Sequence, residues 1–200
     1  MEQNARVTWP SWLPRVLVES ALIVFSVLMA LAVDQWRETR ASEARTREAV
    51  AAITAELRAN RASAERARSF HLETNAALKA IAGRKELPGD DIAYQRGMFN
   101  PAAVVQSAWV TAREGATLQT LPLDVVLKLS RLYEQQESYA QLGDEIARDV
   151  YIDLRRRGFE AVLREGFAGF ILLTTDFAGR ESKLIERYDD ALATLSALPQ

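Results

Sequence analysis

The chain has 200 residues, 48% of them hydrophobic and 26% charged, which suits one folded domain plus an anchor and excludes a disordered protein. Its 25 basic and 27 acidic residues give a net charge of −2, too balanced to attract DNA or RNA, so we expect no nucleic-acid partner. The absence of cysteine excludes disulfides, thiol catalysis and cysteine-ligated zinc.

After an N-terminal tail of residues 1–15, residues 16–33 form the most informative segment. Fifteen of these 18 residues are apolar, and as a helix they measure about 27 Å, close to the hydrocarbon core of a bilayer. The Val, Leu, Ile and Phe residues contribute roughly −3 to −7 kcal/mol to insertion, which offsets Glu19 and two serines. Trp9, Trp12 and Trp36 flank the segment as interfacial aromatic residues do. The segment is predicted to be a transmembrane helix.

A cleaved signal peptide is the alternative interpretation of this segment. Ala30-Leu31-Ala32 matches the small-x-small pattern of a cleavage site, and Arg6 and Arg15 could form the basic region before it. Glu19 interrupts the required apolar run, and the helical pattern continues beyond the segment, so we favour an uncleaved anchor.

The charges that flank the segment leave the orientation open. Arg6, Arg15 and the α-amino group precede it, and four arginines follow within fifteen residues, a difference too small for the positive-inside rule to decide. We expect a single-pass protein of a bacterial inner membrane, with the side of its soluble domain undecided.

Residues 34–82 contain neither Pro nor Gly and are predicted to form a long amphipathic stalk helix. Apolar or small residues recur in steps of three and four, as in a weak coiled-coil seam, with polar gaps at Asn60, His71 and Thr74. Arg61 and Glu65 are spaced to form an ion pair on the exposed face.

A polar loop is predicted over residues 83–91, where Gly83, Pro88 and Gly89 interrupt the helical pattern. Asn100 and Pro101 then favour a helix start, which predicts a short helix over 101–114 that carries Trp109 towards the core.

Two or three further helices are expected towards the C-terminus. Residues 121–124 open a helix that Gly143 could divide and that extends to Arg157, where three arginines suit the negative end of the helix dipole. Another helix is predicted over 170–197, with an apolar seam that includes Tyr188. The expected fold is all-α: one transmembrane helix that continues into the stalk, followed by a helical bundle over 83–200 that the stalk completes.

No motif in the chain predicts a catalytic or metal site. His71 is the only histidine, so a triad or a histidine-based metal site has no partner histidine, and we expect a structural role for it. The adjacent acidic pairs, such as Asp144 and Glu145, diverge on a helix and are expected to be solvated. We expect no catalytic residue, cofactor or metal, and therefore no enzyme. A hydrolase with carboxylates from separate helices would require three acidic groups around a cleft.

The span and its exit, residues 19–38, resemble an uncharacterised group of bacterial single-span proteins similar to the DUF6090 family. The shared features are an acidic residue that opens the span, Glu19, and the motif Asp34-Gln-Trp36 that closes it. Residues 107–115 and 129–133 are similar to the later portion of such proteins. The resemblance implies a membrane-anchored helical domain of unknown activity and brings no catalytic residues.

These observations favour a non-enzymatic scaffold or accessory subunit of a membrane complex. Its partners would be membrane lipid and either another membrane protein or a second copy of the chain, with Glu19, Asp34, Trp36 and Arg37 as the candidate contacts. The alternative is a membrane-anchored sensory or ligand-binding bundle, which would need a pocket lined by Trp109, Tyr133 and neighbouring polar groups.

Overall fold

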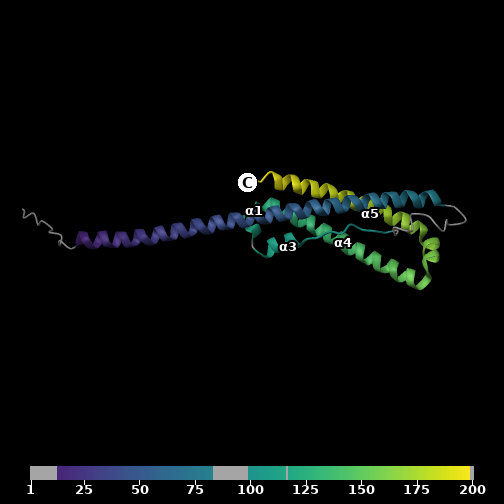
Figure 1. Ribbon diagram of the computed structural model, residues 1–200, viewed down its shortest axis with the longest axis horizontal. Coiled ribbons are helices and arrows are strands. Elements are labelled where there is room, and N and C mark those ends of the chain that lie inside the picture. Colours follow the sequence, from purple (N-terminus) through teal and green to yellow (C-terminus); the bar gives the residue numbers. More distant parts are fainter. Residues whose placement is uncertain (1–12, 83–98, 116, 199–200) are drawn as a thin grey trace, which may run out of the picture. The chain divides into compact units, whose positions relative to one another are not determined.

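The computed structural model describes residues 13–82, 99–115 and 117–198, and all regular structure in these ranges is helical (Figure 1). The elements in chain order are α1 (Leu13–Ile81), α3 (Ser107–Glu114), the 3-10 helix η1 (Thr117–Thr120), α4 (Leu123–Arg157) and α5 (Phe159–Ser196). The chain divides into two compact units, Met1–Arg45 and Thr46–Gln200. The expected all-α class is confirmed, and α1 runs without a break from the apolar segment into the predicted stalk.

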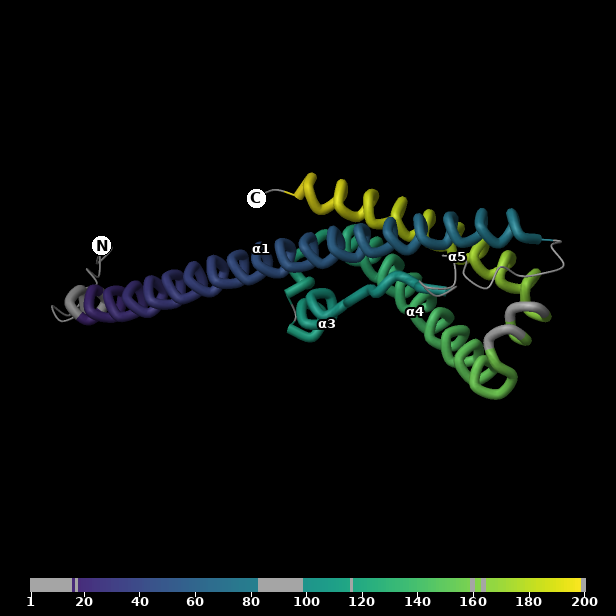
Figure 2. The backbone as a smooth tube through the Cα atoms, turned by 45° about the vertical axis from the view of Figure 1, so that its right-hand side comes forward, coloured from purple at the N-terminus to yellow at the C-terminus, as the bar shows by residue number. Residues whose placement is uncertain are grey.

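The second unit is a bundle of three long helices: the part of α1 from Thr46 onward, α4 and α5. Helix α5 runs antiparallel to α1, as the contacts Arg61–Asp189 and His71–Glu181 show, and the two helices lie side by side in both views (Figures 1 and 2). Helix α4 starts beside Thr46, whose hydroxyl lies 2.6 Å from that of Thr120 in η1. The C-terminal half of α4 then diverges from α1 towards the α4–α5 hairpin (Figure 2).

One continuous stripe of α1 faces the other two helices. It combines apolar residues with the polar residues that the sequence pattern treats as gaps, and every member is buried: Ile53, Leu57, Asn60, Ala64, Ala67, His71, Thr74, Leu78 and Ile81. The spacing alternates strictly between three and four residues, which keeps the stripe on one face of the helix. The polar gaps are therefore part of the core.

Trp109 and Tyr133 belong to the main core. Their rings stack 5.1 Å apart with an interplanar angle of 7°, and both side chains are buried. A smaller cluster near the hairpin joins the end of α1 to α5 through Leu78, Val162 and Phe170. The predicted role of Trp109 as a core residue is confirmed.

The predicted helix over 101–114 is wrong in its first half. Helix α3 begins only at Ser107, and residues 99–106, here called the linking segment, have no regular structure. Asn100 and Pro101 resemble a helix start, but buried side chains of α1 and α4 form hydrogen bonds with backbone groups of the linking segment. These tertiary hydrogen bonds replace the helical ones.

Gly143 does not divide α4, which continues to Arg157 as a single helix. A Cβ atom at this buried position would lie 3.2 Å from both Cβ and Cγ of Pro101, so the glycine lets the linking segment approach the helix closely. Gly158, with φ at 79°, instead marks the end of α4. Helix α5 begins at Phe159, eleven residues before the predicted start, and contains Gly166 and Gly169. The predicted loop over 83–91 lies outside the described residues.

Candidate functional site

The apolar segment of α1 forms the most extensive exposed hydrophobic surface among the described residues. Between Val16 and Val33 the large apolar side chains that the structure describes are 46–66% exposed, and no described segment covers them. This helix is the one in the described part of the chain that is long and apolar enough to cross a membrane, with a mean hydropathy of 1.7 in its best window. An exposed apolar surface of this size favours aggregation in water, and such surfaces are typical of membrane or protein interaction sites.

The four predicted contact residues all lie on α1 and are all exposed: Glu19, Asp34, Trp36 and Arg37. The guanidinium carbon of Arg40 lies 4.8 Å from the ring centroid of Trp36, a cation–π contact one turn further along the helix. Glu19 lies fifteen residues before Asp34, so the helix keeps the two acidic residues at opposite ends of the apolar segment.

The linking segment is held by amide side chains from α1 and α4. Asn60 accepts a hydrogen bond from the Val105 N–H at 3.0 Å and donates one to the Val105 carbonyl at 2.6 Å. Gln136 donates to the same carbonyl, and its own Oε1 accepts from Asn60 and from the Tyr188 hydroxyl. The two amides therefore satisfy both backbone groups of Val105, which lies outside any helix or strand.

Glu56 of α1 caps the N-terminus of α3 from outside that helix. Its Oε2 accepts from the Ala108 N–H at 2.8 Å and from the Ser107 hydroxyl at 3.1 Å, and Oε1 accepts from the Tyr133 hydroxyl at 2.7 Å. A negative charge at a helix N-terminus is stabilised by the free N–H groups and the helix dipole. The buried carboxylate thus orients α3 against the bundle.

The third polar cluster joins His71, Glu181 and Tyr139. His71 Nδ1 lies 3.0 Å from each Glu181 oxygen, and Nε2 accepts a long 3.4 Å hydrogen bond from the Asn100 N–H, which assigns the Nδ1–H tautomer. Tyr139 donates to Glu181 at 2.6 Å while its oxygen accepts from the Ala102 N–H. His71 and Glu181 are fully buried and Tyr139 is 3% exposed, so substrate has no access to this acid–base set.

Burial raises the pKa of Tyr133, Tyr139 and Tyr188 above the ordinary value of 10.0. The hydrogen bonds that Tyr133 and Tyr139 donate to carboxylates raise the pKa of these two hydroxyls further. All three side chains therefore stay protonated and act as hydrogen-bond donors in the core.

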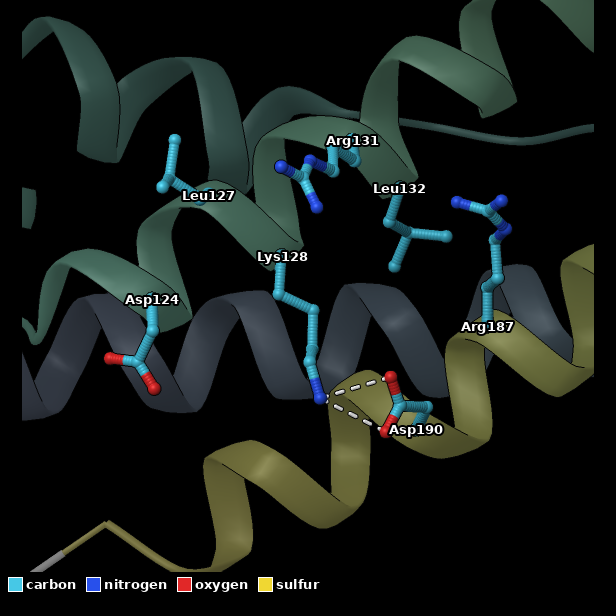
Figure 3. Close-up of a pocket in the computed structure, with 7 residues that line it drawn as sticks. All are labelled: Asp124, Leu127, Lys128, Arg131, Leu132, Arg187 and Asp190. Atoms are coloured by element: carbon cyan, nitrogen blue, oxygen red, sulfur yellow. Dashed lines mark hydrogen bonds and ion pairs between the residues drawn. The ribbon is translucent and has the colours of Figure 1, made fainter.

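A shallow hollow of about 340 Å³ lies between α4 and α5 on the surface of the bundle. Figure 3 shows Lys128 turned down towards Asp190, with Nζ 3.0 Å from the carboxylate, and Arg131 and Arg187 on either side of Leu132. Neither of these two guanidinium groups has an ion pair within the described ranges.

The structure uses His71 as a core residue, in agreement with the expected structural role, and sequence reasoning missed its partners. Glu56, Asn60 and Gln136 give no motif, because they are 52 to 77 residues from some of the groups that they meet. The only feature of the sequence that indicates burial of these polar residues is the position of Asn60 and His71 in the three-four repeat. In the described part of the chain, no three His, Asp or Glu residues gather as metal ligands would.

Comparisons with known proteins do not assign the chain to a family: no protein-family model, no curated protein and no solved structure matches it. The structure therefore has to suggest the function by itself.

Proposed function

We propose that this chain is a single-pass protein of a bacterial inner membrane whose helical domain serves as a non-enzymatic scaffold or accessory subunit. The observation that carries the proposal is the apolar surface of α1 over residues 16–33, whose described large side chains are exposed and not covered by any described segment. Burial of this surface in lipid would remove a hydrophobic area that water cannot solvate favourably.

The uninterrupted helix supports an anchor that is retained. Helix α1 passes through Ala30-Leu31-Ala32 and continues to Ile81, so cleavage there would cut within regular structure. The features at the two ends of the segment, Glu19 and the Asp34–Arg37 stretch, are the proposed contacts with a neighbouring membrane protein. The resemblance to the DUF6090 family remains a prediction and agrees with this proposal.

The interior of the bundle supports a binding role over catalysis. The only histidine is buried between Glu181 and the linking segment. A sensory bundle would need a ligand pocket at Trp109 and Tyr133, but the two rings stack on each other there. Buried polar groups such as Glu56, Asn60 and Tyr139 hold the linking segment and α3. The domain is thus built to present a fixed surface.

Three measurements test the proposal. Extraction of native membranes at alkaline pH should leave the full-length protein in the membrane fraction, and release into the supernatant would refute the anchor. Single cysteines at exposed Ala41 and Ala147, introduced into a chain without native cysteine, should react with an impermeant maleimide from one side only. Chemical crosslinking in the same membranes should give adducts, and a strictly monomeric protein without adducts would refute the accessory role.

A further inference from the structure

The hollow between α4 and α5 combines apolar and cationic groups in an order that matches a protein ligand. Leu123, Leu127 and Arg131 follow one another at intervals of four residues, so they lie along one face of α4. Leu123 is 70% exposed and Leu127 is 46% exposed, and both lie at the start of the helix, where no described segment covers them. Arg187 of α5 lines the same hollow from the opposite side (Figure 3).

The charges around the hollow are unevenly satisfied. Lys128 is engaged by Asp190 and also donates to the Thr194 hydroxyl at 2.8 Å, so its ammonium group is occupied. Arg131 and Arg187, by contrast, have no acidic partner among the described residues, so both guanidinium groups beside the hollow are available to a ligand. Two free guanidinium groups around one hollow favour a bidentate carboxylate ligand.

We propose that the surface formed by Leu123, Leu127, Arg131 and Arg187 docks an amphipathic acidic segment of another protein. Apolar side chains of the segment would cover the two leucines, and an Asp or Glu carboxylate would lie between the two guanidinium groups. This inference rests on the proposed accessory role and specifies the chemistry of its partner.

The surrounding acidic residues favour a discrete carboxylate over an anionic membrane surface. Asp124 and Asp190 line the hollow, and Glu186 and Asp189 are exposed next to Arg187 on α5. An extended layer of lipid phosphates would meet these negative charges as well as the arginines, whereas a single acidic side chain can approach the arginines alone.

Site-specific photocrosslinking of the full-length protein in native membranes tests the inference. A photoreactive benzoylphenylalanine at Leu127 should give an adduct with a segment that contains Asp or Glu beside apolar residues. The same group at Leu172, which is 71% exposed on α5 and does not line the hollow, should not give that adduct. The double variant R131E/R187E should lower the adduct yield at position 127 about tenfold or more, which corresponds to at least ~1.4 kcal/mol.

A matched variant and a charge exchange separate specific docking from a change in net charge. R58E/R66E alters two exposed arginines of α1 by the same total charge and should leave the adduct unchanged. Replacement of the partner's acidic residues by lysine should restore the adduct to R131E/R187E. Circular dichroism should show equal helix content in both double variants, because all four arginines are exposed.

The remaining outcomes overturn the inference. Acidic docking would be refuted if the adduct survives in R131E/R187E or falls equally in R58E/R66E. It would also be refuted if the adduct joins the photoreactive group to lipid, to a second copy of this chain or to a segment without acidic residues. Adducts from other surface positions but none from Leu127 would refute this surface while leaving the accessory role intact. An absence of adducts at every position would refute the accessory role itself.

Discussion

Removal of the Glu56 carboxylate should destabilise the domain more than removal of any exposed carboxylate on α1. In Glu56→Ala the Ala108 N–H and the Tyr133 hydroxyl, at 2.8 and 2.7 Å from the carboxylate, both lose their acceptor. Hydrogen bonds to a charged group contribute about 1.5–3 kcal/mol each, and a buried donor without an acceptor is costly. Relief of the buried charge offsets part of this loss, so we expect the free energy of unfolding to fall by about 3–5 kcal/mol.

Graded variants show whether the cap is the cause. Glu56→Gln keeps one acceptor oxygen and should cost about 1–3 kcal/mol. Glu48→Ala removes an exposed carboxylate from the same helix and should change stability by less than about 0.5 kcal/mol. In a double-mutant cycle, Glu56→Ala and Tyr133→Phe should be less than additive by about 1–2 kcal/mol, because each variant removes the same hydrogen bond.

Urea unfolding of the full chain in mild detergent, followed by circular dichroism, gives these free energies. The m-value should be the same for all variants, since the unfolded chain exposes the same surface. A Glu56→Ala variant within about 1 kcal/mol of Glu48→Ala would refute the reasoning that the carboxylate holds α3 against the bundle.

Three further predictions concern the linking segment, the tyrosines and the anchor. Gly143→Ala should destabilise the domain by about 1–2 kcal/mol, because the new Cβ would press on Pro101, whose two neighbours are held by hydrogen bonds. The control Gly179→Ala has open space around the new Cβ and should stabilise α5 by up to about 1 kcal/mol. Chemical denaturation compares the two variants, and equal effects would contradict the close approach of Pro101 to Gly143. Because the pKa values of Tyr133, Tyr139 and Tyr188 are raised in the folded state, their contribution to the free energy of unfolding is complete below pH 10 and is lost as the pH rises above it. Three tyrosines that ionise only on unfolding should lower the free energy of unfolding by about 4 kcal/mol at pH 11, which urea titration can measure. A stability that does not change between pH 9 and 11 would contradict the burial of these tyrosines. Arginines at Ile23 and Phe25 should together cost roughly 5–7 kcal/mol of insertion free energy and release the protein from alkali-washed membranes, while Leu172→Arg should not; retention of the double variant would contradict a spanning helix.

The sequence pattern alone predicts the elements whose signals are local. The apolar run at 16–33, the absence of Pro and Gly in 34–82 and the break at Gly158 each depend on residues within one or two turns, and α1 and the end of α4 follow them closely. Periodicity also places Tyr188 correctly in the core. Helix propensity and hydrophobic period are sums over neighbouring residues, so they can be evaluated without knowledge of the fold.

The linking segment and the buried polar residues depend on the tertiary structure. Asn100 and Pro101 have the local chemistry of a helix start, yet the Ala102 and Val105 N–H groups find their acceptors on Tyr139 and Asn60, which are 37 and 45 residues away in the chain. Glu56 is an ordinary helical glutamate until α3 presents its free N–H groups to it. The sequence determines by itself that this protein is helical and carries a membrane-length apolar segment. Only the packing of three helices decides that Asn60, His71 and Glu181 belong inside, because a buried polar group is tolerated only where the assembled fold supplies its hydrogen-bond partners.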